Sequence, residues 1–367
     1  MFDFLDVDPP VEALLKEAKQ EGVNLFGAGN FAHAVMDALK ELGVRVHAFV
    51  VSTPDGDCCG PVPVLGFASL DEFAKSRPLW IAVYNRSAAA DLIAIADMCL
   101  ARGIKRVILP QEYYEVVQHQ LGWRFWLTDR RRYADARESI ESAYALLGDE
   151  ASQQNFLATL RFRLAIPMEG TPVPPTDSQY FPAEISAKLQ ANERGNVFVD
   201  GGAYDGDTLI HAAAKIPLAR VYAFEPDLVN FNRLALNSRQ LKIPVVNFPC
   251  GLSAKTEWLA FAGDKGEASS VLLDGNVRIQ CVSLDECLIG EHIDYLKLDI
   301  EGHELAALAG AKETIARERP ILAIAAYHRW DDLWQIPKTI LGISPTYRIS
   351  YKVHECNTFD GVFYATI

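Results

Sequence analysis

Apolar and polar residues alternate along the C-terminal half of this chain in blocks that predict a repeated strand–helix order. Apolar strands are predicted at 196–199, 220–224, 245–248, 294–300 and 321–325. Two more strands, at 347–353 and 361–367, follow one another across a short loop. The repeated units predict a parallel sheet with helices on both faces. The closing pair predicts an antiparallel hairpin at one edge of that sheet.

The N-terminal third carries a shorter pattern of the same kind. Strand 23–26 leads into Gly27-Ala28-Gly29-Asn30-Phe31-Ala32, and a helix over 32–42 and a second strand over 44–51 follow. In this Gly-x-Gly-x-x-Ala arrangement a tight turn brings a helix N-terminus close to an anion. The acidic residue that would bind a ribose after the second strand is missing, because Ser52 stands there. A nucleotide or sugar-nucleotide site and a Rossmann-like domain that binds nothing both remain open.

The pattern divides the chain into three predicted parts. These are a Rossmann-like N-terminal domain over 1–110, a helical connector over 111–190 and a larger α/β domain over 191–367. The connector mixes aromatic residues with Arg130-Arg131-Arg132 and continues as amphipathic helices. The arginine cluster could bind phosphate groups of a substrate, although a solvated helix face is the simpler interpretation. The aromatic residues could support a homodimer.

Charge and apolar run length limit the partners of the chain. The formal net charge of −13 argues against nucleic acid, which requires a basic surface. The longest apolar runs are strand-sized, far below the roughly 20 residues of a membrane span. The N-terminus is acidic where a signal peptide would be basic, and the seven cysteines show no metal-ligand spacing. We therefore expect a cytoplasmic protein with no nucleic-acid partner and no membrane span.

Glycines and acidic residues follow the first two strands of the larger domain. Asp200-Gly201-Gly202 ends the first strand, and glycines there allow the backbone to approach a ligand closely. Glu225 ends the second strand, where an acid can accept hydrogen bonds from both hydroxyls of a ribose. No lysine follows the glycines as in a triphosphate loop, and Asp205 and Asp207 would repel a pyrophosphate. S-adenosylmethionine, a cationic nucleoside without phosphate, suits this pattern. An acidic loop without a ligand is the alternative.

A third acidic segment, 294–304, follows a later strand and reads DYLKLDIEGHE. Asp299, Glu301 and Glu304 lie close together after a buried strand, where carboxylates are costly to desolvate unless they have partners. Ligands of open α/β sheets bind at the carboxyl ends of the strands. The segment therefore predicts a functional site. A purely structural explanation, with Glu304 at a helix N-terminus and Gly302 in a turn, is the alternative.

Together these segments resemble the FkbM family of S-adenosylmethionine-dependent methyltransferases. The likeness covers about 195–367 and rests on Asp200-Gly201-Gly202-Ala203, Glu225-Pro226, Ser283-Leu284-Asp285 and Leu298-Asp299-Ile300-Glu301-Gly302-His303-Glu304. It implies an α/β, Rossmann-like class I methyltransferase domain with a mostly parallel seven-stranded sheet and an antiparallel C-terminal hairpin. The N-terminal segment resembles those of sugar-nucleotide-modifying enzymes. With the connector, it resembles an extended subgroup thought to act in surface polysaccharide metabolism.

The resemblance also implies an activity, the O-methylation of a hydroxyl on a sugar, polysaccharide or small-metabolite acceptor. Asp200 is then expected near the amino-acid end of S-adenosylmethionine, Glu225 at its ribose, and Cys250 and Leu252 beside its adenine. The full set of expected cofactor contacts is Asp200, Gly201, Gly202, Ala203, Tyr204, Asp207, Thr208, Glu225, Pro226, Cys250 and Leu252.

The methyl acceptor would have to lose a proton, and Asp299, His303 and His328 are the candidates to accept it. We assign no metal ligands, because no other motif completes a ligand set. A divalent ion held by Asp299, Glu301 and Glu304 that activates the hydroxyl is the alternative. Two other functions stay open, namely an NAD(P)-dependent oxidoreductase that uses the N-terminal glycine loop and a non-catalytic nucleoside-binding protein with the same fold.

Overall fold

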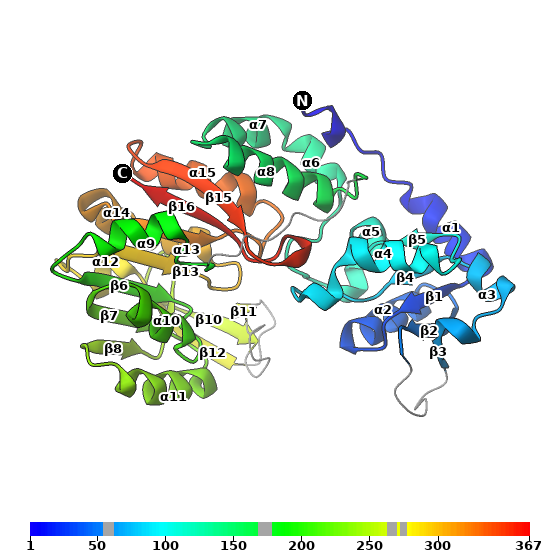
Figure 1. Ribbon diagram of the computed structural model, residues 1–367, viewed down its shortest axis with the longest axis horizontal. Helices are drawn as coiled ribbons and strands as arrows, with labels where there is room; N and C mark the ends of the chain where they lie inside the picture. The colour runs from blue at the N-terminus through cyan, green and yellow to red at the C-terminus, as the bar shows by residue number, and fades with distance from the viewer. Residues whose placement is uncertain (54–61, 168–177, 263–269, 272–276) are drawn as a thin grey trace. The chain divides into compact units, whose positions relative to one another are not determined.

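The computed structural model describes residues 1–53, 62–167, 178–262, 270–271 and 277–367 (Figure 1). Two units share these residues. Unit 1 comprises Met1–Glu141, Leu157–Pro174 and Glu355–Phe359, and unit 2 comprises Ser142–Phe156, Pro175–His354 and Asp360–Ile367. Each unit is therefore built from several separate stretches of chain. The predicted division at residues 110 and 190 stays a prediction.

Unit 1 contains a parallel five-stranded sheet in the order β3-β2-β1-β4-β5. Its strands are β1 (Val23–Phe26), β2 (Val46–Val51), β3 (Val64–Gly66), β4 (Leu79–Ile81) and β5 (Val107–Ile108). Its helices are η1 (Asp3–Leu5), α1 (Val11–Glu21), α2 (Asn30–Glu41), η2 (Phe67–Ser69), α3 (Glu72–Ser76), η3 (Ala88–Ala90), α4 (Leu92–Ala101), α5 (Pro110–Leu121), α6 (Arg131–Asp135) and η6 (Cys356–Thr358). Helices α7 (Arg137–Ala145) and α8 (Glu150–Arg163) each contribute residues to both units.

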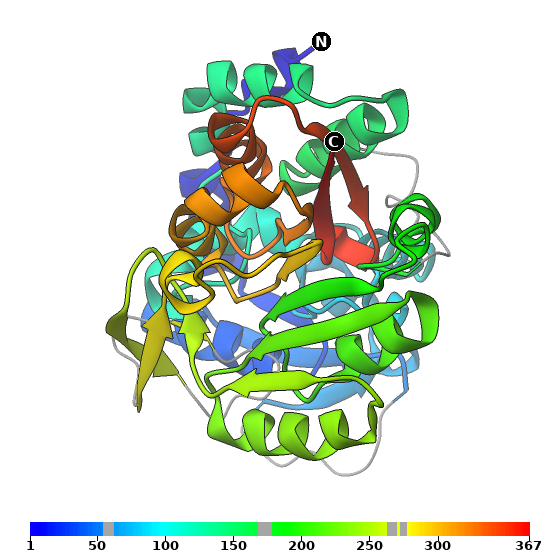
Figure 2. The same cartoon turned by 90° about the vertical axis from the view of Figure 1, so that its left-hand side faces the viewer.

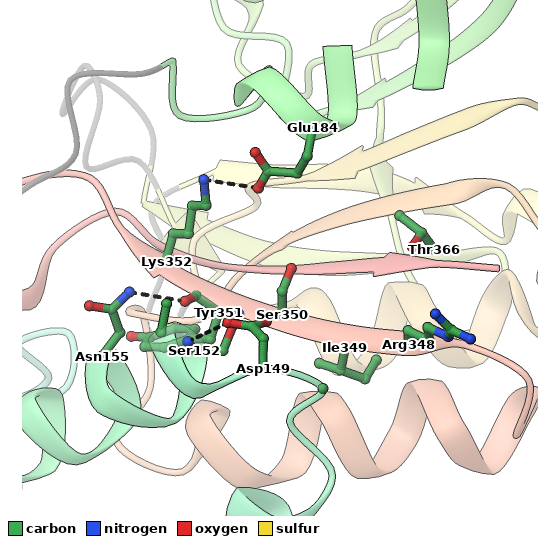
Figure 3. A pocket seen from close by; sticks show the side chains of 12 residues that line it. Asp149, Ser152, Asn155, Glu184, Arg348, Ile349, Ser350, Tyr351, Lys352 and Thr366 are labelled. Atoms are coloured by element: carbon green, nitrogen blue, oxygen red, sulfur yellow. Dashed lines mark hydrogen bonds and ion pairs between the residues drawn. The ribbon is translucent and has the colours of Figure 1, made fainter. Parts of the chain in front are cut away.

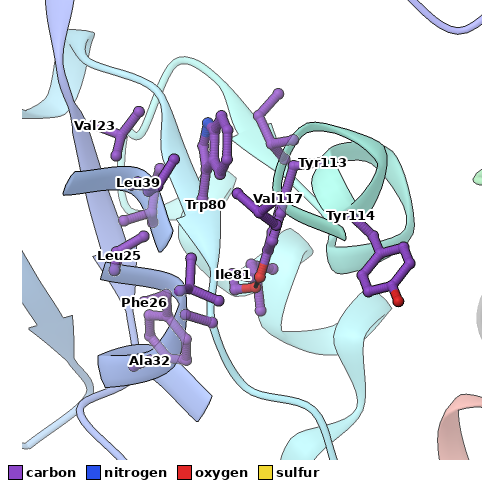
Figure 4. Close-up of a cluster of buried hydrophobic side chains, with 14 of the residues drawn as sticks. Val23, Leu25, Phe26, Ala32, Leu39, Trp80, Ile81, Tyr113, Tyr114 and Val117 are labelled. Carbon is purple, nitrogen blue, oxygen red and sulfur yellow. Dashed lines mark hydrogen bonds between the residues drawn. The ribbon is translucent and has the colours of Figure 1, made fainter. Parts of the chain in front are cut away.

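Aromatic side chains connect the sheet of unit 1 to helix α5 (Figure 4). Trp80 stacks on Tyr113 with ring centroids 4.6 Å apart, and both side chains are fully buried. The hydroxyl of Tyr113 donates to the carbonyl of Ile81 at 2.9 Å, so its one polar atom is satisfied inside the core. Burial of two such rings fixes α5 on the sheet.

A short segment from near the C-terminus completes unit 1. The side chain of Asn357 is fully buried and accepts a hydrogen bond from the amide of Leu92 at 3.0 Å. Its amide group donates to the carbonyls of Asn85 and Ala90 at 2.9 and 2.7 Å. One side chain thereby satisfies backbone groups around the start of α4.

Unit 2 contains a seven-stranded sheet in the order β15-β16-β14-β13-β6-β7-β8. Its strands are β6 (Asn196–Gly201), β7 (Leu218–Phe224), β8 (Val245–Phe248), β13 (Tyr295–Leu298), β14 (Ile321–Ala325), β15 (Arg348–Val353) and β16 (Gly361–Thr366). Neighbouring strands are parallel except where β16 pairs with β14 and β15. The predicted fold class, with its antiparallel C-terminal hairpin, is confirmed.

The helices of unit 2 lie before, between and after its strands along the chain. They are α9 (Ala183–Gln190), α10 (Asp207–Lys215), α11 (Leu228–Asn237), η4 (Ser238–Gln240), α12 (Leu284–Cys287), α13 (Glu304–Gly310), α14 (Lys312–Glu318) and α15 (Asp332–Ile343). Helix α11 lies beside edge strand β8 (Figure 2). Ala311 separates α13 from α14. A second sheet, in the order β11-β10-β12-β9, contains β9 (Gly251–Leu252), β10 (Glu257–Ala262), β11 (Ser270–Val271) and β12 (Val277–Val282).

The other edge strand, β15, is shielded by the turn between α7 and α8 (Figure 3). The amide of Gly148 donates to the carbonyl of Ile349 at 2.9 Å, and the amide of Tyr351 donates to Ser152 at 2.9 Å. A cavity of about 380 Å³ lies along this edge and contains the ion pair Lys352–Glu184 at 2.9 Å. Its lining includes none of the predicted cofactor residues. Covered edges resist pairing with other chains.

Candidate active site

The ends of strands β6 and β13 touch each other at Gly202. Gly202 has a φ of +75°, and a Cβ atom at this position would lie 1.9 Å from the carbonyl oxygen of Asp299. Only glycine allows this approach, because any side chain would collide with backbone that cannot move aside cheaply. The contact joins the predicted cofactor loop directly to the predicted catalytic turn.

A buried ion pair lies directly beneath this contact. Asp200 on β6 and Lys297 on β13 are register partners, and their charged groups are 2.9 Å apart. Both side chains are almost fully buried, and the Lys297 ammonium also donates to the carbonyls of Gly202 and Gly201 at 2.7 and 3.3 Å. Burial raises the pKa of Asp200 to about 6, although Lys297 acts in the opposite direction. Asp200 therefore faces Lys297, which in turn supports the carbonyls of the glycine loop.

Glu225, at the end of β7, organises the loop from the other side. Its two carboxylate oxygens accept hydrogen bonds from the amides of Tyr204 and Asp227, both at 2.9 Å. Burial raises the pKa of Glu225 to about 7, with the two amides acting in the opposite direction. Asp227 in turn caps α11 by accepting from the amides of Val229 and Asn230. Glu225 thus links the glycine loop to the start of α11.

The other predicted cofactor residues lie in neighbouring segments and differ in how deeply they are buried. Leu252 lies beside Gly201, where a Cβ atom would be 3.0 Å from Leu252 Cδ1, and Pro226 lies near Gly251. Ala203 is buried in the core, and Cys250 is also buried. Asp207 and Thr208 open helix α10, with Asp207 exposed and Thr208 partly exposed. The segments that carry the predicted residues therefore meet at the carboxyl ends of β6, β7 and β8.

Asp299 is held by two phenol hydroxyls and lies close to a histidine, and these groups come from two distant parts of the chain. The hydroxyl of Tyr180 donates to Oδ2 at 2.6 Å, the hydroxyl of Tyr327 donates to Oδ1 at 3.1 Å, and His328 Nε2 is 3.3 Å from Oδ1. Burial alone would raise the pKa of Asp299, but Lys297, His328 and the two phenols lower it below its ordinary value. Asp299 is therefore an ionised and fixed carboxylate.

His328 is the centre of the acidic cluster formed by Asp299, Glu301 and Glu304. Its Nδ1 lies 2.8 Å from Glu304 and its Nε2 lies 3.7 Å from Glu301, and the ring is fully buried. Burial alone would lower the pKa of His328, but Glu304 and Glu301 raise it to about 10. The structure therefore describes an imidazolium enclosed by carboxylates.

The same cluster has a spacing that could hold a metal ion. Asp299, Glu304 and His328 each offer one ligand atom, and these atoms lie within 4.8 Å of one another. Both ring nitrogens of His328 face carboxylate oxygens at these distances, and a cation could bind there only if one ring nitrogen gave up its proton. We therefore describe the cluster as an ion-pair network and assign no metal ligands.

His303, the remaining predicted catalytic residue, faces another direction. Its Nε2 is 3.1 Å from the hydroxyl of Ser253, which donates to Glu257 at 2.8 Å. Burial lowers the pKa of His303. The described contacts of His303 thus join α13 to the second sheet, whereas Asp299 and His328 lie together.

Three residues of the site escaped the sequence analysis. Lys297 was treated as part of an apolar strand, although a single lysine in such a strand signals a buried partner. Tyr327 directly precedes His328 and could have been found from its place after β14. Tyr180 is 119 residues from Asp299 in the chain, and no local pattern indicates it.

Comparison with known proteins agrees with this geometry. Residues 200–356 match the family model described as the methyltransferase FkbM domain. The chain carries the methyltransferase domain of the FkbM family. Hexuronic acid methyltransferase AglP of Haloferax volcanii is 28% identical over 179 residues, which cover 47% of this chain and 71% of AglP. The crystal structure of methyltransferase FkbM from Methylobacillus flagellatus KT has 22% identity and a TM-score of 0.72, covering 99% of this chain and 95% of that chain.

The match of residues 200–356 to the FkbM domain model, together with the similarity to AglP, makes the chain a methyltransferase, and this class of domain implies S-adenosylmethionine as the methyl donor. The likeness to the Methylobacillus flagellatus structure shows a shared fold. Among the described residues, no helix combines the length and the apolar character that crossing a membrane requires.

The ion-pair network of the FkbM domain predicts an unusual pH dependence of stability. A group whose pKa is higher in the folded state than in the unfolded state stabilises the fold through its bound proton. This stabilisation is complete at a pH below the unfolded-state pKa, and it is lost as the pH rises through the folded-state pKa. For His328 this window runs from 6.5 to about 10. We expect the free energy of unfolding to fall across this window in urea titrations.

The His328→Gln variant should lose at least ~3 kcal/mol near neutral pH, because it leaves the surrounding carboxylates without their counter-charge. Its deficit relative to the unaltered protein should shrink as the pH approaches 10. A deficit that stays constant over this range would show that His328 is uncharged in the folded protein.

Proposed function

We propose that this domain transfers the methyl group of S-adenosylmethionine to a hydroxyl oxygen of a sugar, with a hexuronic acid unit as the favoured acceptor class. The observation that carries the proposal is the contact between Gly202 and the Asp299 carbonyl. Because of this contact, a nucleoside on the glycine loop would have its reacting end at the acidic cluster. The SN2 reaction requires alignment of donor, methyl group and acceptor above all.

The residues around the glycine loop fit the proposed methyl donor. Glu225 is a buried carboxylate at the end of the second strand of the domain, where ribose hydroxyls are bound in sheets of this kind. Gly201 and Gly202 have no side chains, so a ligand can approach their backbone closely, and Leu252 supplies apolar surface beside them. Lys297 neutralises Asp200, so the loop itself presents less negative charge than its sequence suggests. S-adenosylmethionine would supply a methyl group activated by a sulfonium sulfur.

The acidic cluster favours a hydroxyl over a carboxylate as the methyl acceptor. Asp299, Glu301 and Glu304 share one imidazolium at His328. A sugar carboxylate brought among them would add a further negative charge in a partly buried setting, where repulsion is weakly screened. A hydroxyl adds no charge and can donate its proton to a carboxylate oxygen. The similarity to a hexuronic acid methyltransferase supports a sugar acceptor, and the cluster supports methylation of its hydroxyl.

Titration with S-adenosylhomocysteine by calorimetry tests the proposal without any acceptor. We expect binding, and we expect Glu225→Gln to weaken it about 10- to 100-fold, because hydrogen bonds to a charged group contribute about 1.5–3 kcal/mol each. The matched control is Glu193→Gln, which makes the same change at an exposed position. No binding by the unaltered protein would refute the proposal. Binding of NADPH in its place would support an oxidoreductase that uses the N-terminal glycine loop.

A further inference from the structure

Asp299, the residue expected closest to the reaction, is poorly placed to accept a proton. Tyr180 and Tyr327 each donate to one of its carboxylate oxygens, and His328 adds a third contact. These contacts stabilise the ionised form, and they would have to weaken if Asp299 became protonated. Asp299 therefore acts as a fixed negative charge that positions its neighbours.

The other titratable groups near Asp299 are buried or contact other segments. His328 is fully buried, and Glu304 is 1% exposed and accepts from the amide of Ile300 at 2.9 Å. His303 contacts Ser253 on the second sheet. Among the described carboxylates of this turn, Asp299 and Glu301 have partly accessible side chains, of which 23% and 18% are exposed, and only Asp299 is held by the two phenols.

The backbone of Glu301 is held in a conformation that a glutamate rarely adopts. Its φ is +55°, and Gly302 follows with a φ of +92°. A non-glycine residue in this region costs of order 1–3 kcal/mol, and such residues concentrate at functional sites. The turn directs the Glu301 side chain toward His328, with Oε2 of Glu301 3.7 Å from Nε2 of the ring. The same ring nitrogen also faces Asp299. Its Oε2 is buried and has no hydrogen-bond partner among the described residues.

We propose that Glu301 is the general base that accepts the proton of the acceptor hydroxyl. This inference rests on the proposed function. The hydroxyl oxygen forms a bond to the methyl carbon while the bond from that carbon to sulfur breaks, and the electron pair of the broken bond stays on sulfur. The hydroxyl proton moves to the Glu301 carboxylate. The products are a methyl ether, S-adenosylhomocysteine and protonated Glu301, so atoms and charge balance.

Charged groups from several elements face Glu301. They are Asp299 after β13, Glu304 in α13, His328 after β14 and Asp360 before β16. Burial raises the pKa of Glu301 to about 8, with His328 acting in the opposite direction and the three carboxylates in the same one. A base with a pKa near the working pH accepts and releases its proton most effectively.

The first test separates catalysis from structure by comparing stability with activity. Glu301→Gly removes the carboxylate and relieves the strained φ, so we expect an equal or higher melting temperature. Methyl transfer to p-nitrophenyl β-D-glucuronide should fall about 10²- to 10⁴-fold in kcat, while affinity for S-adenosylhomocysteine changes less than about threefold. Glu301→Gln should lose activity likewise, and Glu313→Gln, an exposed change on α14, should not. An unchanged kcat in Glu301→Gly would overturn the proposal.

The second test needs no acceptor and measures proton release on ligand binding. S-adenosylmethionine carries a positive sulfonium and S-adenosylhomocysteine does not, so only the first should stabilise an ionised Glu301 nearby. Calorimetry in two buffers of different ionisation enthalpy, near pH 8, should therefore show more proton release with S-adenosylmethionine. Glu301→Gln should abolish the difference.

The outcomes distinguish this inference from the proposed function. A proton-release difference that persists in Glu301→Gln, or full activity of that variant, overturns the role of Glu301 and leaves the methyltransferase function intact. Activity lost with a chelator and restored by Mg²⁺ would likewise overturn it, because a metal would then activate the hydroxyl. Failure to bind either ligand refutes the proposed function itself.

Discussion

Lys297→Met should lose about 3–5 kcal/mol of unfolding free energy, because it leaves the carboxylate of Asp200 buried without its counter-charge. The variant also removes the donor to the carbonyls of Gly201 and Gly202, so the glycine loop loses its support from β13. We therefore expect binding of S-adenosylhomocysteine to fall beyond detection. Urea unfolding and calorimetry measure the two effects.

A double variant shows whether the ion pair is responsible. In Lys297→Met/Asp200→Asn no buried charge is left unpaired, so stability should recover a substantial part of the loss. Lys312→Met, at an exposed position on α14, controls for the change of residue type. If the double variant loses the sum of the unfolding free energies that the two separate changes cost, the pair does not support the loop. The same conclusion follows if Lys297→Met alone is as stable as the unaltered protein.

Gly202→Ala should disable the cofactor site through a steric conflict. The new Cβ atom would lie 1.9 Å from the Asp299 carbonyl oxygen, so the loop and the acidic turn must move apart. A displacement of this kind near reacting groups costs about 100-fold in rate, and we expect S-adenosylhomocysteine to bind correspondingly more weakly. Calorimetry and thermal unfolding measure both consequences.

Gly290→Ala is a matched control for this prediction. Gly290 has a φ of +76°, almost equal to that of Gly202 at +75°, and nothing lies within 4 Å of its added Cβ atom. Gly290→Ala should therefore show only the conformational cost of about 1–2 kcal/mol and unchanged ligand binding. Equal effects of the two variants would mean that backbone conformation, and not the contact with Asp299, explains the loss.

The sheet of unit 2 was predictable because each of its strands is an apolar block ended by a polar turn. The segment 294–300, for example, is predicted as a strand, and β13 occupies its centre as Tyr295–Leu298. The meeting of Asp299 with His328 was predictable for the same reason, since β13 and β14 are neighbouring parallel strands. Strand order in such sheets follows from general rules, so residues at adjacent strand ends can be paired in advance.

Side-chain direction within the turn could not be predicted. His303 and Glu304 are adjacent in the chain, yet His303 contacts Ser253 and Glu304 contacts His328. The different directions of these two side chains depend on two successive positive φ angles, at Glu301 and Gly302. No sequence rule places a glutamate in the positive-φ region. The contribution of Tyr180 depends on packing between distant segments, which residue patterns do not contain.

Unit 1 is expected to finish folding only after nearly the whole chain has been synthesised. The hydrogen bonds of Asn357 around the start of α4 join positions 265 to 272 residues apart. Until residues 355–359 leave the ribosome, the amide of Leu92 and the carbonyls of Asn85 and Ala90 lack that partner. The N-terminal sheet must therefore persist as an incomplete intermediate while the methyltransferase unit is translated, and such intermediates depend most on chaperones.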